Sequence, residues 1–321
     1  MYYNLLLLLS LVSAAPANNL FGRDLQRQRD APWGLARLSH KDYVYDKTAN
    51  NLYSDENSFV YESRTAATPT VYVLDTGVLV QHQELGGRAR WGNNFVDSTL
   101  SDGNGHGTHI AGLVAGSTVG VARNAQIIAV KVLNEKRVGS ISNFVKAIDW
   151  VLQDVRDNNR QNVIINYSAV GDPDDTRAAA INKATNAGLL VVVAAGNNGK
   201  QVCNYGPAGE ASQNSGLISV MALNWTNTPA SFSNWGSCGS VYAPGVDVYS
   251  IRPDSTTSYG YMSGTSNAAG YVSGLAAYLW SLYPQISRDD LKNMITTGNA
   301  NKVLSNRPGT ANEIVWNYMS A

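Results

Sequence analysis

The chain has 321 residues, 44% of them hydrophobic and 15% charged, so it is long enough to bury a core and too apolar for a disordered protein. Lys plus Arg and Asp plus Glu number 24 each, which gives a formal net charge of zero. Nucleic-acid-binding proteins usually carry a basic excess, so the composition argues against a nucleic-acid partner.

The N-terminus has the pattern of a secretory signal peptide. Residues 5–12 form an apolar run and small residues follow at 13–15, so we expect cleavage after Ala14 and assign residues 1–14 to the signal. A buried N-terminal strand is the alternative. The run is shorter than the about 20 apolar residues that a membrane span needs, and no later run is long enough. We therefore expect a secreted protein without a membrane span, outside the cell or in its wall, with the vacuolar lumen as the alternative.

The residues that follow the signal are rich in charge. Residues 22–30 alternate Arg, Asp and Gln with few apolar positions, which predicts a solvated loop. We therefore assign residues 15–30 to a short linker-like segment.

Beyond residue 70 the pattern becomes regular. The helix signals are apolar residues at three-to-four-residue spacing over 141–155, an alanine-rich stretch over 177–187 that ends at Gly188, and small apolar residues all round over 266–282. Between them lie short apolar runs typical of buried strands, at residues 71–74, 126–132, 162–168 and 189–195. This alternation predicts an α/β fold with three layers, a parallel β-sheet sandwiched by helices, and a functional site at the carboxyl ends of the strands.

Two polar segments interrupt this pattern. Asp75 ends a predicted strand in Asp75-Thr76-Gly77, a tripeptide that pepsin-like aspartic proteases also contain. Those enzymes need two acids that share a proton, and the chain has no second such tripeptide. His106 lies among glycines in residues 102–112, three residues before His109. A histidine pair that binds a metal is the alternative there, but no third ligand is evident, so we expect no metal site.

The third polar segment is Gly264-Thr265-Ser266, where Ser266 begins a predicted helix. Alone, this serine would be a helix N-cap. The N–H groups of a helix N-terminus also suit a developing oxyanion, and a serine becomes nucleophilic when a histidine held by a third group removes its proton. The order Asp75, His106, Ser266 is the order of the subtilisin triad.

These motifs resemble the subtilase family, and within it the proteinase K branch. The resemblance begins near residue 31, because residues 31–37 are similar to the mature N-terminus of that branch. It implies a subtilisin-like peptidase domain over 31–321 and a serine endopeptidase that cleaves proteins or peptides through an acyl-enzyme. It also implies that Asp75, His106 and Ser266 are catalytic. Residues 15–30 are then a short pro-like segment that cannot form the inhibitory pro-domain of the family, so we expect a trans-acting folding helper or inhibitor.

The resemblance implies three further features. Asn197 in Ala195-Gly196-Asn197 matches the oxyanion residue of the family, with a simple turn residue as the alternative. Cys203 and Cys238 match a disulfide of some members, which is also the default in a secreted chain, with two free thiols as the alternative. No cofactor is required. Calcium stays an open alternative, although Ser240 stands near the position of the usual aspartate ligand.

The substrate-binding segment departs from the family pattern Ser-Leu-Gly-Gly. It consists here of Ser168, Ala169, Val170 and Gly171. Val170 replaces a glycine beside the pocket for the residue before the scissile bond, so we expect a narrow pocket that prefers small residues. Val170, the altered residues after Ser266 (Asn267, Gly270 and Tyr271) and the short pro-like segment together leave an alternative function, a catalytically degenerate subtilase that binds peptides or serves as a wall or coat protein.

Two glycosylation sequons begin at Asn166 and Asn224. Asn166 lies in a predicted buried strand and should be unmodified. Asn224 lies between strands, and we expect a glycan there.

Overall fold

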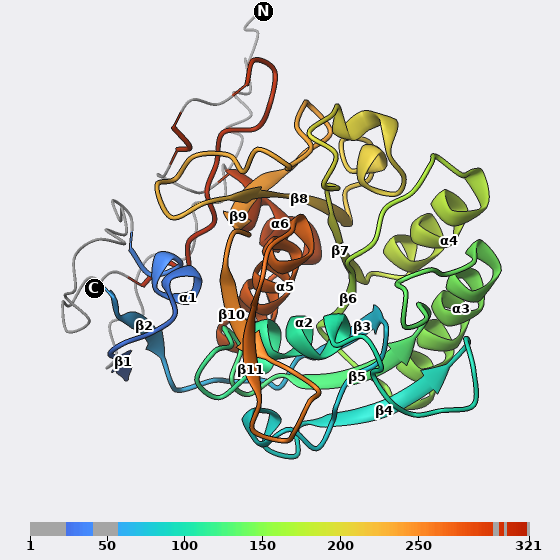
Figure 1. Cartoon of the computed structure of the whole chain (residues 1–321), viewed down its shortest axis with the longest axis horizontal. Helices are drawn as coiled ribbons and strands as arrows, with labels where there is room; N and C mark the ends of the chain where they lie inside the picture. Colours follow the sequence, from blue (N-terminus) through green and yellow to red (C-terminus); the bar gives the residue numbers. More distant parts are fainter. Residues whose placement is uncertain (1–23, 41–56, 298–301, 305–306, 320–321) are drawn as a thin grey trace, which may run out of the picture.

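The structure is a computed structural model that describes residues 24–40, 57–297, 302–304 and 307–319 (Figure 1). The predicted signal peptide lies outside the described residues, as do residues 15–23 of the segment after it. In the part of the chain that is described, no helix is both long enough and apolar enough to cross a membrane.

A seven-stranded sheet forms the centre of the fold, and all its neighbouring strands run parallel in the order β4-β5-β3-β6-β7-β8-β9. Every residue of β3, β6, β7 and β8 is buried, which explains their nearly continuous apolar sequences. The predicted strands are β3, β5, β6 and β7, at the middle of the sheet. The seven strands are β3 (Thr70–Asp75), β4 (Ala89–Asn94), β5 (Gln126–Lys131), β6 (Val163–Tyr167), β7 (Leu190–Ala194), β8 (Leu217–Leu223) and β9 (Val241–Pro244).

Helices cover both faces of this sheet (Figure 1). One face carries α2 (His106–Ala115) and α5 (Thr265–Leu282), and the opposite face carries α3 (Ile141–Asp157) and α4 (Asp175–Asn186). The predicted three-layer α/β fold is therefore confirmed. Shorter helical elements lie around it: α1 (Trp33–Arg37), α6 (Arg288–Thr297), η2 (Gln83–Leu85), η3 (Val202–Asn204) and η4 (Ala208–Glu210).

The three predicted helices correspond to α3, α4 and α5. The Ser140 hydroxyl accepts the N–H of Asn143 at 3.0 Å and so caps the start of α3. Gly188 follows α4 with a φ of +90°, a conformation that favours glycine. In α5 every residue from Thr265 to Ser281 is buried, as its uniformly small and apolar sequence predicts.

Two antiparallel sheets of two strands each lie outside the central sheet. In the first, β1 (Leu25–Gln28) pairs with β2 (Phe59–Glu62). The prediction of a loop over residues 22–30 is therefore wrong for β1, whose mostly exposed side chains gave no apolar signal. The second is a hairpin of β10 (Val248–Ile251) and β11 (Tyr259–Met262), which leads directly into α5.

Candidate active site

Asp75 and His106 form a buried hydrogen-bonded pair. Asp75 is the last residue of β3 and is fully buried, whereas His106 begins α2 and is 3% exposed. The imidazole Nδ1 lies 2.8 Å from Asp75 Oδ1 and 2.9 Å from Oδ2. A carboxylate at Nδ1 favours the tautomer with its proton there, which leaves Nε2 as a proton acceptor. This is the arrangement that a general base requires.

Glycines allow α2 to approach the end of β3 this closely. A Cβ atom on Gly107 would lie 2.1 Å from the carbonyl oxygen of Gly77 and 3.0 Å from Asp75 Cβ. Gly105, just before the helix, has a φ of +93° that other residues rarely adopt. The glycine-rich sequence around His106 therefore follows from the close packing of two backbones.

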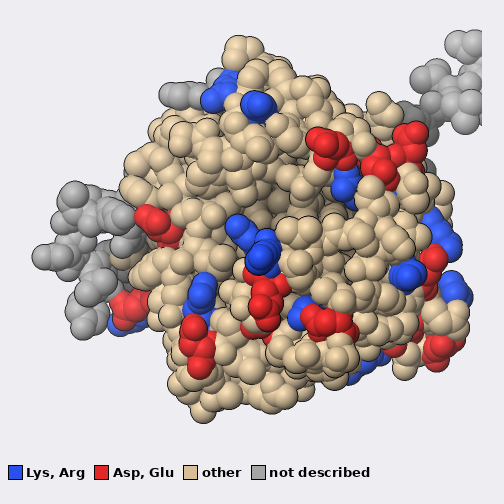
Figure 2. Space-filling model, turned by 45° about the vertical axis from the view of Figure 1, so that its right-hand side comes forward, with Lys and Arg blue, Asp and Glu red and all other residues tan. Residues whose placement is uncertain are grey.

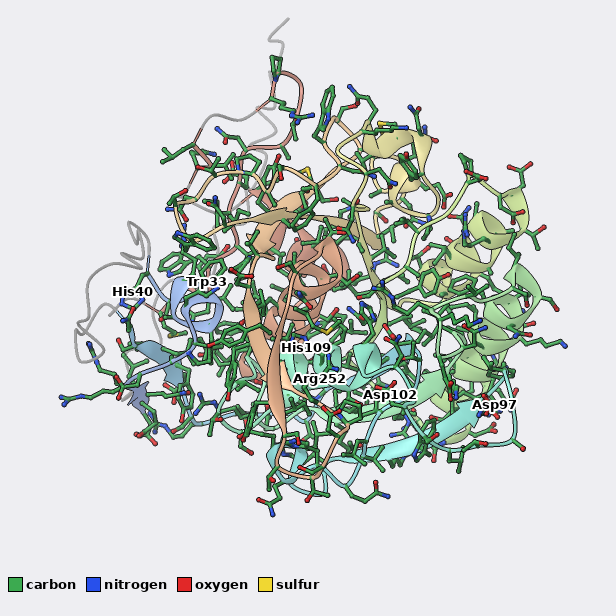
Figure 3. All side chains as sticks on the ribbon, viewed as in Figure 1. Trp33, His40, Asp97, Asp102, His109 and Arg252 are labelled. Atoms are coloured by element: carbon green, nitrogen blue, oxygen red, sulfur yellow. A yellow bond between two sulfur atoms is a disulfide. The ribbon has the colours of Figure 1, made fainter. Side chains whose placement is uncertain are left out.

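Asp102 organises the loop that leads to His106 (Figure 3). Its Oδ1 accepts the Thr76 hydroxyl at 2.7 Å and the Gly105 N–H at 2.8 Å. Its Oδ2 accepts the backbone N–H and the hydroxyl of Thr108 at 2.8 and 2.6 Å. This buried carboxylate caps α2 and ties it to the turn after β3. The sequence motif alone does not identify this role, and its one signal is an acid just ahead of a helix N-terminus.

Ser266 lies in the first turn of α5 and lines a cavity of about 260 Å³ together with His106. Its hydroxyl donates to the carbonyl oxygen of Ser168 at 3.1 Å. Without substrate, catalytic hydrogen bonds are often long or poorly aligned, and they tighten only in the complex with substrate. The structure thus brings the three predicted catalytic residues to the carboxyl end of the sheet, with the serine hydroxyl turned to Ser168.

Asn197 lies beside the N-terminus of α5. Its Oδ1 accepts both the N–H and the hydroxyl of Thr265 at 2.9 Å, so its amide group is held in one orientation. A Cβ atom on Gly264 would lie 3.4 Å from Asn197 Nδ2 and 3.7 Å from the Ser266 nitrogen. The Asn197 amide nitrogen and the Ser266 backbone nitrogen thus both lie within 4 Å of one point beside Gly264, and two neighbouring N–H donors are what an oxyanion needs.

The predicted substrate-binding residues lie mostly in the same cavity. Ser168, Ala169 and Val170 line it, whereas Gly171 pairs with Gly206 through two backbone hydrogen bonds of 3.0 Å and is not part of the lining. Val170 Cγ2 lies 3.3 Å from the place where Gly196 would carry a Cβ. The side chain of Val170 is thus packed against the segment that carries Asn197.

Asn234 holds the oxyanion segment from behind. It is fully buried, its amide donates to the Ala195 carbonyl at 2.9 Å, and its Oδ1 accepts the N–H groups of Asn198 and Lys200 at 3.1 and 3.0 Å. These partners lie on both sides of Asn197. Neither charge nor a motif singles out Asn234 in the sequence, because its partners are more than 30 residues away.

A disulfide joins the same two segments. Cys203 and Cys238 are bonded with an S–S distance of 2.12 Å, which confirms the predicted pair. Backbone hydrogen bonds join the two segments next to the disulfide. The Val202 N–H donates to the Trp235 carbonyl at 2.7 Å, and the Trp235 N–H donates to the Lys200 carbonyl at 3.0 Å. The loop after β7 is therefore fastened by both covalent and backbone bonds.

The residues considered as metal ligands, His109 and Ser240, have backbone groups as partners in this structure. His109 Nε2 lies 3.2 Å from the Val248 carbonyl oxygen, and burial lowers the pKa of this histidine to about 4. Ser240, near the position of the calcium-binding aspartate of the family, uses its hydroxyl to accept the Ser219 N–H at 3.1 Å. Within the described ranges, no three His, Cys, Asp or Glu side chains gather to hold a metal ion.

The two sequon asparagines differ in accessibility. Asn166 is fully buried in β6 and its amide donates to the Ser273 hydroxyl at 2.9 Å. Asn224 is half-buried in a turn where its Oδ1 accepts the N–H groups of Thr226 and Thr228, both at 3.0 Å.

Comparisons with known sequences identify similar proteins over most of the chain. A family model described as "Subtilase family" matches residues 66–316. Among curated relatives, "Subtilisin-like protease 2" of Pseudogymnoascus destructans is 41% identical, over 80% of this chain and 60% of that protein. "Cuticle-degrading serine protease" of Arthrobotrys oligospora is 38% identical, over 90% of this chain and 69% of that protein. The chain spans between 59% and 61% of the length of several curated relatives that it matches.

A solved structure extends the similarity to three dimensions. A cold-adapted subtilisin-like serine proteinase matches with a TM-score of 0.78 and 32% sequence identity. The match covers 90% of this chain and 98% of that one. The two proteins therefore share a fold over most of this chain.

Proposed function

Because the chain belongs to the subtilase family, we propose that it is a serine endopeptidase that hydrolyses peptide bonds through an acyl-enzyme at Ser266. One observation carries the proposal. The cavity at the carboxyl end of the sheet is lined by His106, whose Nδ1 is paired with buried Asp75, and by Ser266, whose backbone nitrogen lies near the Asn197 amide nitrogen. These are the nucleophile, base and oxyanion donors that acyl transfer needs.

The proposed reaction has two chemical stages. Ser266 Oγ leaves its hydrogen bond to Ser168, attacks the substrate carbonyl carbon, and passes its proton to His106 Nε2. The oxyanion is stabilised by Asn197 Nδ2 and the Ser266 N–H. His106 then protonates the leaving amine, the C–N bond breaks, and an ester to Ser266 remains. A water then gives a proton to His106 and attacks the ester carbon. The bond between this carbon and Ser266 Oγ breaks, Oγ takes the proton back from His106, and the carboxylic acid product leaves, while Asp75 holds the imidazolium in place.

We propose that the pocket for the residue before the scissile bond accepts small side chains. Val170 narrows the cavity between Ala169 and the oxyanion segment, because its Cγ2 packs against Gly196. Peptides with alanine or glycine at that position are the expected substrates.

We also propose that the protein acts after secretion. The signal-like N-terminus and the Cys203–Cys238 disulfide support an oxidising compartment, with the extracellular space or cell wall as the first destination and the vacuolar lumen as the alternative. A glycan on Asn224 belongs to the same proposal. We expect the protein to act on protein or peptide substrates and to have a folding helper or inhibitor that acts in trans.

A fluorophosphonate probe tests the catalytic proposal directly. Such a probe phosphonylates only a serine that a base activates, with loss of fluoride. Wild-type protein should be labelled, and Ser266→Ala with an unchanged circular dichroism spectrum should not. If folded wild-type protein takes up no label, the endopeptidase proposal is wrong. The degenerate peptide-binding function, which Val170 and the Ser266–Ser168 hydrogen bond favour, would then replace it.

A further inference from the structure

A turn after β5 brings two basic side chains to the cavity. Lys136 and Arg137 line it together with His106 and Ser266, and no Asp or Glu is among the described residues of its lining. Because the whole chain has zero formal net charge, this local excess of positive charge is not a consequence of composition. Figure 2 shows basic side chains at the edge of a hollow in one face of the molecule.

The turn that carries these residues is held rigidly. Asn134 Oδ1 accepts the N–H groups of Lys136 and Val138, both at 2.9 Å, and the Asn134 N–H donates to the Val138 carbonyl at 2.9 Å. The amide of Asn104, from the loop before His106, donates to the Glu135 carbonyl at 2.6 Å. The two basic residues are therefore presented from a fixed backbone.

Arg137 adopts an unfavourable backbone conformation in this turn. Its φ of +59° lies in the left-handed region, where a residue with a side chain loses about 1–2 kcal/mol relative to glycine. Glycine would satisfy the turn, so an arginine here is locally disfavoured. The turn thus carries the Arg137 side chain at the cavity in spite of this cost.

The charges of both side chains are available to a ligand. In the described part of the chain, neither Lys136 nor Arg137 has a side-chain hydrogen bond or an ion pair, and both are exposed. The nearest acid in sequence, Glu135, is turned toward Gly103, where a Cβ would lie 2.6 Å from its Oε1. Asp75 is already bonded to His106.

The order of strands places this turn close to the scissile bond. It follows β5, Asp75 ends β3, Ser168 follows β6 and Asn197 follows β7, and these four strands are consecutive neighbours in the sheet. Strands lie about 4.8 Å apart and an extended peptide advances about 3.3 Å per residue. A peptide laid across the strand ends would therefore bring a side chain to the turn within roughly three residues of the bond at Ser266.

We propose that Lys136 and Arg137 form a subsite for an acidic side chain, so that substrates with Asp or Glu within about three residues of the scissile bond are preferred. The proposal rests on the proposed endopeptidase function of the same cavity. It assigns the substrate class that the Ser266 site selects, beyond the size limit set by Val170.

Matched peptides measure this preference. A peptide library with Glu, Gln or Lys at each position near the scissile bond should show one position where Glu exceeds Gln in kcat/KM by about tenfold at low salt. Exchange of both cations, Lys136→Gln with Arg137→Gln, should reduce that ratio to about one. Charge reversal, Lys136→Glu with Arg137→Glu, should make Lys the preferred residue. High salt should weaken the wild-type preference, because it screens exposed charges.

The control removes the same net charge elsewhere. Lys146→Gln with Lys183→Gln changes α3 and α4, on the far face of the sheet, and should keep the Glu-to-Gln ratio of wild type. Fluorescence anisotropy of the same peptides on Ser266→Ala separates the subsite from catalysis. If the protein is labelled by the fluorophosphonate and cleaves peptides without preferring Glu, the subsite proposal is wrong and the endopeptidase proposal stands. If the protein is not labelled but binds Glu peptides through Lys136 and Arg137, the endopeptidase proposal is wrong and the subsite proposal stands.

Discussion

At the residue scale, the contact between α2 and β3 depends on the missing side chain of Gly107. A methyl group there would overlap the Gly77 carbonyl oxygen at 2.1 Å and push His106 away from Asp75. We expect Gly107→Ala to lower kcat/KM by about 100-fold, because a displacement of about 1 Å in catalytic geometry has that effect. Steady-state kinetics and thermal unfolding would measure it. Gly270→Ala is the matched control, since its Cβ would meet Leu113 and Ile110 at 3.3–3.5 Å, and wild-type kinetics in Gly107→Ala would contradict the prediction.

Asn234 should act on catalysis through Asn197. We expect Asn234→Ala to lower kcat by roughly ten- to 100-fold with little change in KM, because it releases the backbone on both sides of the oxyanion donor. A double-mutant cycle tests the route. In an Asn197→Ala background, the second substitution should have almost no further effect on kcat. Additive losses would show that Asn234 acts on something other than Asn197.

Val170 should control the size of the residue accepted before the scissile bond. We expect Val170→Gly to raise the ratio of cleavage after Phe to cleavage after Ala by at least about tenfold, since the substitution removes the side chain that packs against Gly196. Competing peptides that differ only at that position give the ratio. Efficient cleavage after Phe or Tyr by the wild-type protein would contradict the narrow pocket, as would an unchanged ratio in the variant.

At the element scale, the loop after β7 is joined to the segment before β9 by the disulfide and by backbone pairing. The Cys203–Cys238 bond closes a loop with a sequence separation of 35 residues, and the loop-entropy model makes this worth about 3–4 kcal/mol. We expect Cys203→Ser with Cys238→Ser to lower the free energy of unfolding by that amount in urea. Reductant should destabilise wild type to a similar extent and leave the double variant unchanged. If reductant leaves the urea midpoint of the wild-type protein unchanged, the prediction is contradicted.

The elements that the sequence predicts are those whose signal is local. The central strands β3 and β7 are apolar because both faces are covered, and α5 is uniformly small and apolar because it is buried all round. β8 carries the same apolar signal and could have been predicted from it. β1 has exposed side chains, so only its pairing with β2 makes it a strand.

The candidate site divides in the same way. Asp75, His106 and Ser266 each lie in a short motif whose residues are contiguous, so the sequence points to them. Asn234 holds the oxyanion segment through partners 34 to 39 residues away, and Asp102 bonds Thr76, 26 residues away, besides its neighbours Gly105 and Thr108. Only the folded chain brings the distant partners together. The position of Lys136 beside the cavity could not be predicted either, because nothing in the neighbouring sequence shows that the turn after β5 lies next to the cavity.

At the scale of the whole molecule, acid should destabilise the fold through a buried histidine. His109 is fully buried, and its Nε2 faces the Val248 carbonyl. Burial, with smaller contributions from nearby His106 and Arg252, lowers its pKa from the ordinary 6.5 to about 4 (Figure 3). A proton on this ring would place a charge inside the protein beside Arg252, so the folded state keeps the ring neutral.

The sign of the pH dependence follows from this difference in pKa. Above pH 6.5 the ring is neutral in both states, whereas between pH 6.5 and 4 the unfolded chain takes up a proton that the folded chain refuses. The free energy of unfolding should therefore fall as the pH drops through this window, by about 1.4 kcal/mol per unit and on the order of 3 kcal/mol in total. Below it, the Asp97 carboxylate bonded to Lys131, with its pKa held at about 2, extends the loss.

Urea unfolding between pH 4.5 and 8 measures this slope. His109→Gln keeps an amide donor near the Val248 carbonyl but cannot titrate, so its stability should be lower at neutral pH and change less on acidification than that of wild type. The comparison of slopes, rather than of absolute stabilities, removes the effect of imperfect packing by the glutamine. If the free energy of unfolding depends on pH equally in the two proteins, His109 is not the cause of the acid sensitivity and other groups are. The first to consider is His82, whose pKa is also lowered by burial and whose ring faces the Ser258 carbonyl.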